Sequence, residues 1–225
     1  MTEKLGLLHT SATLVPIFQA LTDQYLTGKG IKIFNISDDS LIKNTIERGK
    51  LTSDTSRRVV NYVVSASEAG ADFILVTCSS IGPAVEIAAK LVNVPVLRVD
   101  QPMVDKAVQM GSKIGVVATL STTLEPTSDL VSRRATLVGK GIELTSRLCE
   151  GAFDALMDGR PELHDESVAS ELKELSHQVD VILLAQASMA RVANQLSEED
   201  IEVPILSSPE LAVQYLAEIW DSTIR

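Results

Sequence analysis

The sequence predicts an α/β protein made of two similar domains, each with an approximately four-stranded parallel sheet flanked by helices. Three observations support this fold class. Short apolar runs alternate with segments of helical periodicity, this alternation repeats once along the chain, and 225 residues with 45% apolar content can bury a sizeable core. Strand–helix alternation is typical of parallel sheets whose two faces are covered by helices.

Eight short apolar runs are the predicted strands. Most are rich in Val, Ile and Leu and lack an alternation with polar residues, as expected for strands buried on both faces. In chain order they cover residues 5–8, 31–36, 73–76, 94–99, 114–118, 142–144, 181–185 and 203–206.

The segments between these runs show the spacing of helices. Val59, Val63 and Ala66 repeat at steps of four and three, with Tyr62 on the same face, and Leu211 begins a similar pattern near the end of the chain. We expect a first domain formed by residues 1–98 together with a C-terminal helix at about 208–225. Residues 99–207 are expected to form the second domain.

The two halves of the sequence resemble each other. Residues 4–10 resemble residues 113–119, residues 28–31 recur letter for letter as 139–142, and residues 94–97 resemble 203–206, at offsets of 109, 111 and 109. Any two βα units share apolar strands and glycines at helix ends, which is the simpler explanation. The recurrence of four identical letters, with its neighbours in the same order, favours an internal duplication.

A fourth repeated place carries the chemistry. Residues 72–80 align with residues 180–188 at an offset of 108, so Cys78 and Gln186 occupy equivalent positions just past a strand. Ligands of open parallel sheets bind at the carboxyl ends of the strands. We therefore expect an active site between the two domains, with these two residues facing one ligand.

Composition and charge exclude several classes of protein. Thirty acidic against twenty basic residues give a net charge of −10, which argues against a partner rich in phosphate such as a nucleic acid. The longest apolar runs are too short to cross a bilayer, so no membrane partner is expected. Two cysteines make no disulfide framework and no leader is visible, so we expect a cytoplasmic protein.

Common cofactor and hydrolase motifs are missing from the sequence. It contains no G-x-G-x-x-G after a strand, no phosphate-binding P-loop and no G-x-S-x-G elbow. The three histidines, His9, His164 and His177, do not have the spacing of a metal site. The sequence thus gives no support for a nucleotide, a metal or a serine hydrolase.

Residues 76–80, 182–186 and 203–209 resemble the aspartate/glutamate/hydantoin racemase superfamily, which includes maleate isomerase and arylmalonate decarboxylase. Through the duplication the resemblance covers nearly the whole chain. It implies two α/β domains with the active site between them, no cofactor, a small carboxylate-bearing substrate and a homodimer. It also implies one cysteine after a strand in each half, on opposite faces of the substrate.

The sequence keeps the first of these cysteines, as Cys78, and has Gln186 at the place of the second. Racemisation by two bases needs one group that removes a proton and an opposed group that returns one, and a carboxamide does neither near pH 7. Gln186 is able to donate hydrogen bonds to an oxyanion or to hold a carboxylate. His9 and Cys149 are the two candidates for a displaced second acid.

Cys78 is predicted to be reactive. Ser79, Ser80, Gly82 and Pro83 have the pattern of a helix start, with a serine cap and a proline in the first turn. Unpaired N–H groups at such a place stabilise a thiolate. The alternative is that Cys78 is a small buried core residue.

Polar and small residues gather after the predicted first and third strands of each half. In the superfamily these loops bind the carboxylate groups of the substrate, although serine and threonine also cap helices. Arg48, Arg98 or Arg191 could also reach a carboxylate. The predicted substrate-binding residues are His9, Thr10, Ser11, Ser79, Ser80, Thr119, Ser121, Thr122, Ala187 and Ser188.

These observations favour an isomerase of the racemase or epimerase kind, which moves a proton at the carbon next to a carboxylate or carbonyl by means of Cys78. A decarboxylase or another lyase with a single thiol is one alternative, and a cis–trans isomerase with Cys78 as nucleophile is another. A non-catalytic protein that binds small acids is a third. In that reading Gln186 marks lost activity. A further alternative is a generic doubly wound domain, in which the duplication is real but Cys78 belongs to the core.

Overall fold

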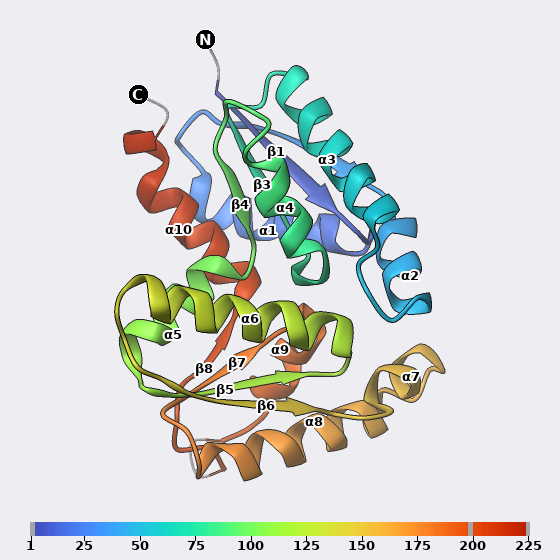
Figure 1. Cartoon of the computed structure of the whole chain (residues 1–225), viewed down its shortest axis with the longest axis vertical. Helices are drawn as coiled ribbons and strands as arrows, with labels where there is room; N and C mark the ends of the chain where they lie inside the picture. The colour runs from blue at the N-terminus through green and yellow to red at the C-terminus, as the bar shows by residue number, and fades with distance from the viewer. Residues whose placement is uncertain (1–2, 198–199, 224–225) are drawn as a thin grey trace. The chain divides into compact units, whose positions relative to one another are not determined.

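The computed structural model describes residues 3–197 and 200–223 of the chain. It divides into two compact units, which we call the first and second unit: Met1–Val99 with Pro209–Arg225, and Asp100–Ser208. Each unit holds a four-stranded sheet in which every pair of neighbouring strands is parallel (Figure 1). The predicted fold class is therefore confirmed.

The two sheets have the same strand order. The first runs β2-β1-β3-β4 and the second β6-β5-β7-β8. The strands of the first sheet are β1 (Lys4–His9), β2 (Lys32–Ser37), β3 (Phe73–Val76) and β4 (Val96–Arg98). Those of the second are β5 (Lys113–Ala118), β6 (Glu143–Leu148), β7 (Val181–Leu184) and β8 (Ile205–Ser207).

Helices follow the strands in both units. The first unit has α1 (Leu14–Leu26), α2 (Ser40–Glu47), α3 (Ser53–Glu68), the 3₁₀ turn η1 (Ser79–Ile81), α4 (Gly82–Ala88) and α10 (Ser208–Thr223). The second has α5 (Gln101–Met110), α6 (Ser121–Leu137), α7 (Ala152–Met157), α8 (Pro161–Ser176), the 3₁₀ turn η2 (Ala187–Met189) and α9 (Ala190–Ala193). The helices predicted from the spacing of Val59 and of Leu211 are α3 and α10.

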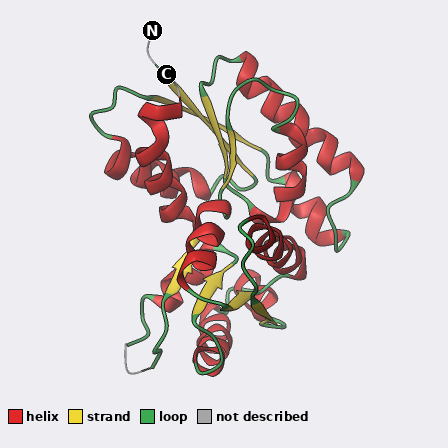
Figure 2. Ribbon diagram, turned by 60° about the vertical axis from the view of Figure 1, so that its left-hand side comes forward, coloured by secondary structure: helices red, strands yellow, loops and turns green. Residues whose placement is uncertain are grey.

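Helices cover both faces of each sheet; in Figure 2 red helices lie on both sides of the yellow strands in each unit. Side chains alternate along a strand, so Leu5 and Leu7 of β1 pack on one side with residues of α1 and α10, whereas Leu8 packs on the other with residues of α3 and α4. In the second unit, Val117 packs with residues of α7, α8 and α9, while α5 and α6 contact the sheet from the opposite side.

Equivalent hydrogen bonds confirm the predicted duplication. The Asp72 carboxylate accepts the Lys4 N–H at 2.8 Å, and the Asp180 carboxylate accepts the Lys113 N–H at the same distance. The strand registers agree as well, since His9 pairs with Ser37 as Ala118 pairs with Leu148. The offset of 108 between β3 and β7 and of 109 between β4 and β8 follows directly from these pairings.

The outer strands β2 and β6 differ from the prediction. β2 has three exposed residues and β6 has two, so burial on both faces is wrong for these two edge strands, whereas the edge strands β4 and β8 have no exposed residue. The run predicted at 142–144 extends to Leu148, where pairing with β5 continues to Ala118. The run predicted at 94–99 is shorter, since only Val96 to Arg98 pair with β3.

Candidate active site

Cys78 lies one residue beyond the Thr77 that follows β3 and directly before η1, with an extended backbone (φ −136°, ψ 120°). Its side chain is half-buried. The thiol sulfur accepts hydrogen bonds from the Thr10 hydroxyl and from the backbone N–H groups of Ser80 and Ile81, and the Ser80 side chain also bonds to it. The donors to the sulfur thus come from the residue Thr10 after β1 and from the η1 turn that follows Cys78.

Burial nevertheless raises the pKa of the Cys78 thiol, and the hydrogen bonds from Thr10, Ser80 and Ile81 only partly oppose this effect. Burial therefore favours the protonated thiol, whereas the N–H groups of the turn favour the thiolate, and the reactivity of Cys78 stays a prediction. The predicted serine cap is wrong, because no side chain caps η1 or α4. Proline does occupy the first turn of α4, as predicted.

Gln186 has the same backbone conformation at the equivalent place before η2 (φ −132°, ψ 139°). Its side-chain oxygen accepts the backbone N–H of Thr119 at 2.6 Å and the Thr119 hydroxyl at 3.0 Å. Because a backbone N–H only donates, this contact fixes which end of the amide is oxygen. The NH₂ end keeps two donors, so Gln186 can donate hydrogen bonds but cannot exchange a proton at neutral pH.

Each half has a threonine at the equivalent position, and both threonines donate to the side chain that follows the third strand. Thr10 follows β1 and donates to Cys78, and Thr119 follows β5 and donates to Gln186. Both threonines are buried. The duplicated fold therefore supplies a fixed donor to whichever side chain follows the third strand of each half.

His9 is not placed as a free acid or base. Its side chain is fully buried, Nδ1 lies 2.9 Å from the Thr77 hydroxyl, and Nε2 lies 2.9 Å from the Asn35 side-chain amide. Burial lowers the pKa of His9, against an opposing effect of Asn35. Both ring nitrogens are occupied by protein groups, which matches the hydrogen-bonded structural histidine rather than a displaced second acid.

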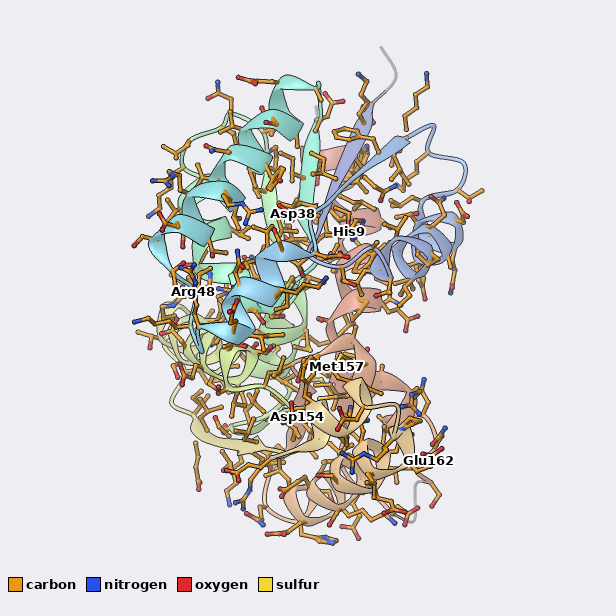
Figure 3. All side chains as sticks on the ribbon, turned by 90° about the vertical axis from the view of Figure 1, so that its right-hand side faces the viewer. His9, Asp38, Arg48, Asp154, Met157 and Glu162 are labelled. Carbon is orange, nitrogen blue, oxygen red and sulfur yellow. The ribbon has the colours of Figure 1, made fainter. Side chains whose placement is uncertain are left out.

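Asp38 and Cys149 lie at equivalent places beyond β2 and β6; Figure 3 labels Asp38 together with His9. Burial disfavours ionisation of Asp38, but hydrogen bonds from Ser40 and Tyr62 and the nearby Arg58 together lower its pKa. Burial raises the pKa of Cys149 to about 12. Cys149 is 1% exposed and packs in the core of the second unit, so it is a structural thiol here.

The remaining predicted binding residues differ in exposure. The Ser11 hydroxyl bonds to Thr13 at 2.8 Å within its own loop. Ser121 is exposed at the start of α6, and the neighbouring Thr122 is buried with no hydrogen-bond partner for its hydroxyl among the described residues. Ser79 is buried, Ala187 is half-buried and Ser188 is exposed.

The structure brings only some predicted site residues into contact. In the first unit Thr10, Cys78 and Ser80 form one hydrogen-bonded group. In the second unit Thr119 and Gln186 form the other. Figure 3 shows His9 at the same edge of the first sheet as Asp38, but the partners of His9 are Thr77 and Asn35.

The three candidate arginines differ in their surroundings. Arg48 is exposed after α2, Arg191 pairs with Asp165, and Arg98 is buried and pairs with Glu86. Sequence reasoning missed Glu86 and the partners of His9, because each is far along the chain from the group it contacts. The only sequence signal for Arg98 is a charged residue inside an otherwise apolar strand.

The part of the chain that the structure describes contains neither a metal-binding cluster nor a membrane-spanning helix. Within residues 3–197 and 200–223, no group of three or more His, Cys, Asp or Glu side chains could hold a metal ion. Over the same residues no helix is both long enough and apolar enough to span a membrane.

The fold and its site define a class: duplicated α/β proteins with a hydrogen-bonded side chain after the third strand of each half, here a thiol and an amide. The sequence model of the Asp/Glu/hydantoin racemase family matches residues 4–216. The chain therefore belongs to this family, and the predicted resemblance is confirmed. No curated protein is similar enough in sequence to count as a match.

Solved structures share the fold at low sequence identity. A glutamate racemase from Bacillus anthracis has a TM-score of 0.74 at 17% identity, covering 98% of this chain and 82% of its own. An aspartate racemase from Picrophilus torridus has a TM-score of 0.71 at 14% identity, covering 96% and 94%. An allantoin racemase from Klebsiella pneumoniae has a TM-score of 0.68 at 15% identity, covering 98% and 88%.

Proposed function

We propose that the protein is a cofactor-independent isomerase of the Asp/Glu/hydantoin racemase type, in which Cys78 exchanges a proton with the carbon next to a carboxylate or carbonyl. The observation that carries the proposal is the set of hydrogen bonds on its sulfur. Thr10, Ser80 and Ile81 donate to a half-buried thiol at the carboxyl edge of a parallel sheet. Family membership and the names of the structural relatives support the same reaction type.

The proton transfer needs the thiol in both of its states. A Cys78 thiolate takes the proton from the substrate carbon, and the C–H electron pair moves into a planar enolate. The resulting thiol returns a proton to that carbon; because Gln186 supplies none from the opposite side, inversion requires that the enolate turn in the site or that water protonate its other face. Donors such as the NH₂ group of Gln186 stabilise negative charge on an enolate oxygen. Because the Gln186 oxygen accepts from Thr119, its NH₂ end is the donor.

The substrate class follows from the donors in the loops. Hydroxyl and backbone N–H groups after β1 and β5 suit a carboxylate, and we propose a small carboxylate-bearing molecule as substrate. Acting on amino acids or their derivatives is the expected preference, since the relatives named above are glutamate, aspartate and allantoin racemases. We further propose that the protein works in the cytoplasm as a homodimer.

A second candidate is a lyase with one thiol, such as a decarboxylase. Two observations favour it: burial raises the pKa of the Cys78 thiol and so favours its protonated form, and Gln186 offers no acid or base. In such a reaction the C–C bond to a carboxylate breaks and carbon dioxide leaves. The electron pair forms an enolate, and the Cys78 thiol protonates its carbon on one face. This reaction requires no opposed second acid.

Solvent-deuterium incorporation in D₂O, followed by NMR, tests the proposal over amino acids, hydantoins, hydroxy acids and substituted malonates. Wild-type protein is compared with Cys78→Ala and with Cys149→Ala as the matched cysteine control. We expect exchange at the α-carbon that falls about 100-fold or more in Cys78→Ala and stays within a few-fold in Cys149→Ala. The handedness of the product then separates racemase from decarboxylase.

Two outcomes contradict the proposal. Exchange that persists unchanged in Cys78→Ala excludes thiol chemistry at this position. Tight binding of a small acid, with no exchange and no turnover of any compound in the panel, instead assigns the protein to non-catalytic binding.

A further inference from the structure

An ion pair between a buried arginine and a half-buried glutamate lies beside the turn that carries Cys78. Arg98 is the last residue of β4 and only 2% exposed, and its Nη1 lies 2.5 Å from a Glu86 carboxylate oxygen on α4. In the sheet Arg98 pairs with Val76, two residues before Cys78. The pair thus joins β4 to the helix that begins directly after the Cys78 turn.

The guanidinium group of Arg98 also packs against Gly82, the first residue of α4. A Cβ atom at this glycine would lie 2.3 Å from the Arg98 Cζ and 2.4 and 2.5 Å from two of its nitrogens, far below any ordinary contact distance. No side chain therefore fits at position 82 while Arg98 keeps its place. Gly82 follows Ile81, whose N–H donates to the Cys78 sulfur.

The second half of the duplication lacks the whole arrangement. The offsets of 108 and 109 place other residues at the positions of Gly82, Glu86 and Arg98; they are Ala190, Asn194 and Ser207. The half that has a Cβ at the place of Gly82, on Ala190, thus has the small Ser207 in place of the arginine. The residue at the place of the cysteine in that half is Gln186, which is neither an acid nor a base near pH 7.

We propose that Arg98 is a positioning residue for Cys78: paired with Glu86 and packed on Gly82, it holds the η1 turn so that the N–H groups of Ser80 and Ile81 point at the sulfur. This inference rests on the proposed function, because it concerns the thiol that we assign to proton transfer. Its test uses the thiol alone and requires no substrate.

The physical consequence concerns how easily the thiol ionises. Hydrogen bonds from backbone N–H groups favour the thiolate over the thiol. When the turn loosens, those bonds lengthen and the thiol holds its proton more tightly. At a fixed pH below the midpoint of ionisation, each unit by which the midpoint rises lowers the thiolate fraction about tenfold.

The experiment measures the rate of Cys78 alkylation by iodoacetamide between pH 6 and 11. A Cys149→Ala background leaves Cys78 as the one thiol of the chain. In Arg98→Met we expect the rate at pH 7.5 to fall about tenfold and the midpoint to rise by about one pH unit. Arg98→Lys keeps the charge but not the planar group. Its alkylation rate at pH 7.5 should lie between those of the parent and of Arg98→Met.

A matched control is available in the second unit. Arg134 of α6 pairs with Asp105 of α5 through two contacts, of 2.5 and 2.9 Å, within that unit. Arg134→Met removes a comparable ion pair from a helix contact, and the alkylation profile should stay within twofold of the parent. Circular dichroism confirms that each variant is folded.

A double-mutant cycle sharpens the test. Gly82→Ala alone displaces the guanidinium and should slow alkylation at pH 7.5 as Arg98→Met does. In the Arg98→Met background the same substitution should have little further effect, because the clashing group is gone. Additive effects of the two substitutions would contradict the packing argument.

An unchanged pH profile in folded Arg98→Met overturns the proposal. If that variant does not fold, Glu86→Gln decides: a shift in the same direction supports the proposal, and a profile equal to the parent overturns it. Failure of the proposed function is a separate result, since it is measured by deuterium exchange and turnover of substrates and not by alkylation of the thiol.

Discussion

At the scale of single residues, each half has an equivalent threonine donor, but the acceptor of its hydrogen bond differs between the halves. Thr10 donates to the Cys78 sulfur, and the equivalent Thr119 donates to the Gln186 oxygen through both its hydroxyl and its backbone N–H. The fold supplies the donor at the same place in both halves. The identity of the acceptor therefore decides whether that half can move a proton.

Thr10→Val removes the hydroxyl donor from Cys78 and leaves the volume almost unchanged. The thiolate loses a hydrogen bond worth about 1 kcal/mol, so we expect alkylation of Cys78 at pH 7.5 to slow about fivefold. The alkylation rate should still rise with pH, because burial already holds the pKa of Cys78 above its ordinary value.

Thr119→Val is the matched control for this prediction. It removes the equivalent hydroxyl from the half that has Gln186, and alkylation of Cys78 should not change. Equal slowing in both variants would show that the threonines act through general stability rather than through the hydrogen bond to sulfur.

The sequence placed Cys78 and Gln186 correctly relative to their strands, because the duplication aligned two stretches with the same local pattern. It did not predict the ionisation state of Cys78, which depends on burial among Ile81, Val85 and other residues of the first unit's core. Nor could it predict the partners of His9. Asn35 and Thr77 are 26 and 68 residues away along the chain and meet His9 only after the sheet forms.

At the scale of elements, all eight strands were predictable because apolar runs of three to six residues between helical segments can be recognised. Their ends were less predictable, since a strand ends where its neighbour stops pairing. The exposed edges β2 and β6 show the same limit, because strand order is a property of the whole sheet.

The beginnings of β5 and β7 are joined by a side chain. The Asp180 carboxylate accepts the N–H groups of Ser112 and Lys113, both at 2.8 Å, and these bonds lower the pKa of Asp180. A lowered carboxyl pKa adds stability above the ordinary pKa of 3.8, and this stability is lost as the pH falls through the folded-state value.

Asp180→Ala should therefore lower the melting temperature by a few degrees at pH 7 and by less below pH 4. Glu218→Gln, which removes an exposed charge from α10, is the control and should show neither effect. A difference between wild type and Asp180→Ala that stays constant from pH 7 to pH 3 would contradict the assigned role of the carboxylate.

At the scale of the whole molecule, the two units differ in whether they are formed by one continuous segment of the chain or by two. The second unit is one continuous segment, Asp100–Ser208, whereas the first needs α10 from the far end. Trp220 of α10 is 1% exposed, its ring centroid lies 5.9 Å from that of Phe73, and its Nε1 donates to Glu3 at 2.6 Å. Without α10, the face of the first sheet that carries Leu5 and Leu7 would lose part of its cover and keep only α1.

The continuity of the second unit predicts that a fragment of residues 100–208 folds alone, because its core residues and all four strands lie within it. A fragment of residues 1–99 should stay largely unfolded, since burial of Ala212, Val213, Leu216 and Trp220 supplies much of one face of its core. Circular dichroism and the dispersion of amide signals in NMR spectra measure both outcomes.

Adding a peptide of residues 209–225 should restore structure to the first fragment. A peptide with Trp220→Ala should do so less well, because truncating a buried tryptophan costs about 3–5 kcal/mol. A folded 1–99 fragment without the peptide would show that α10 is dispensable to the first unit.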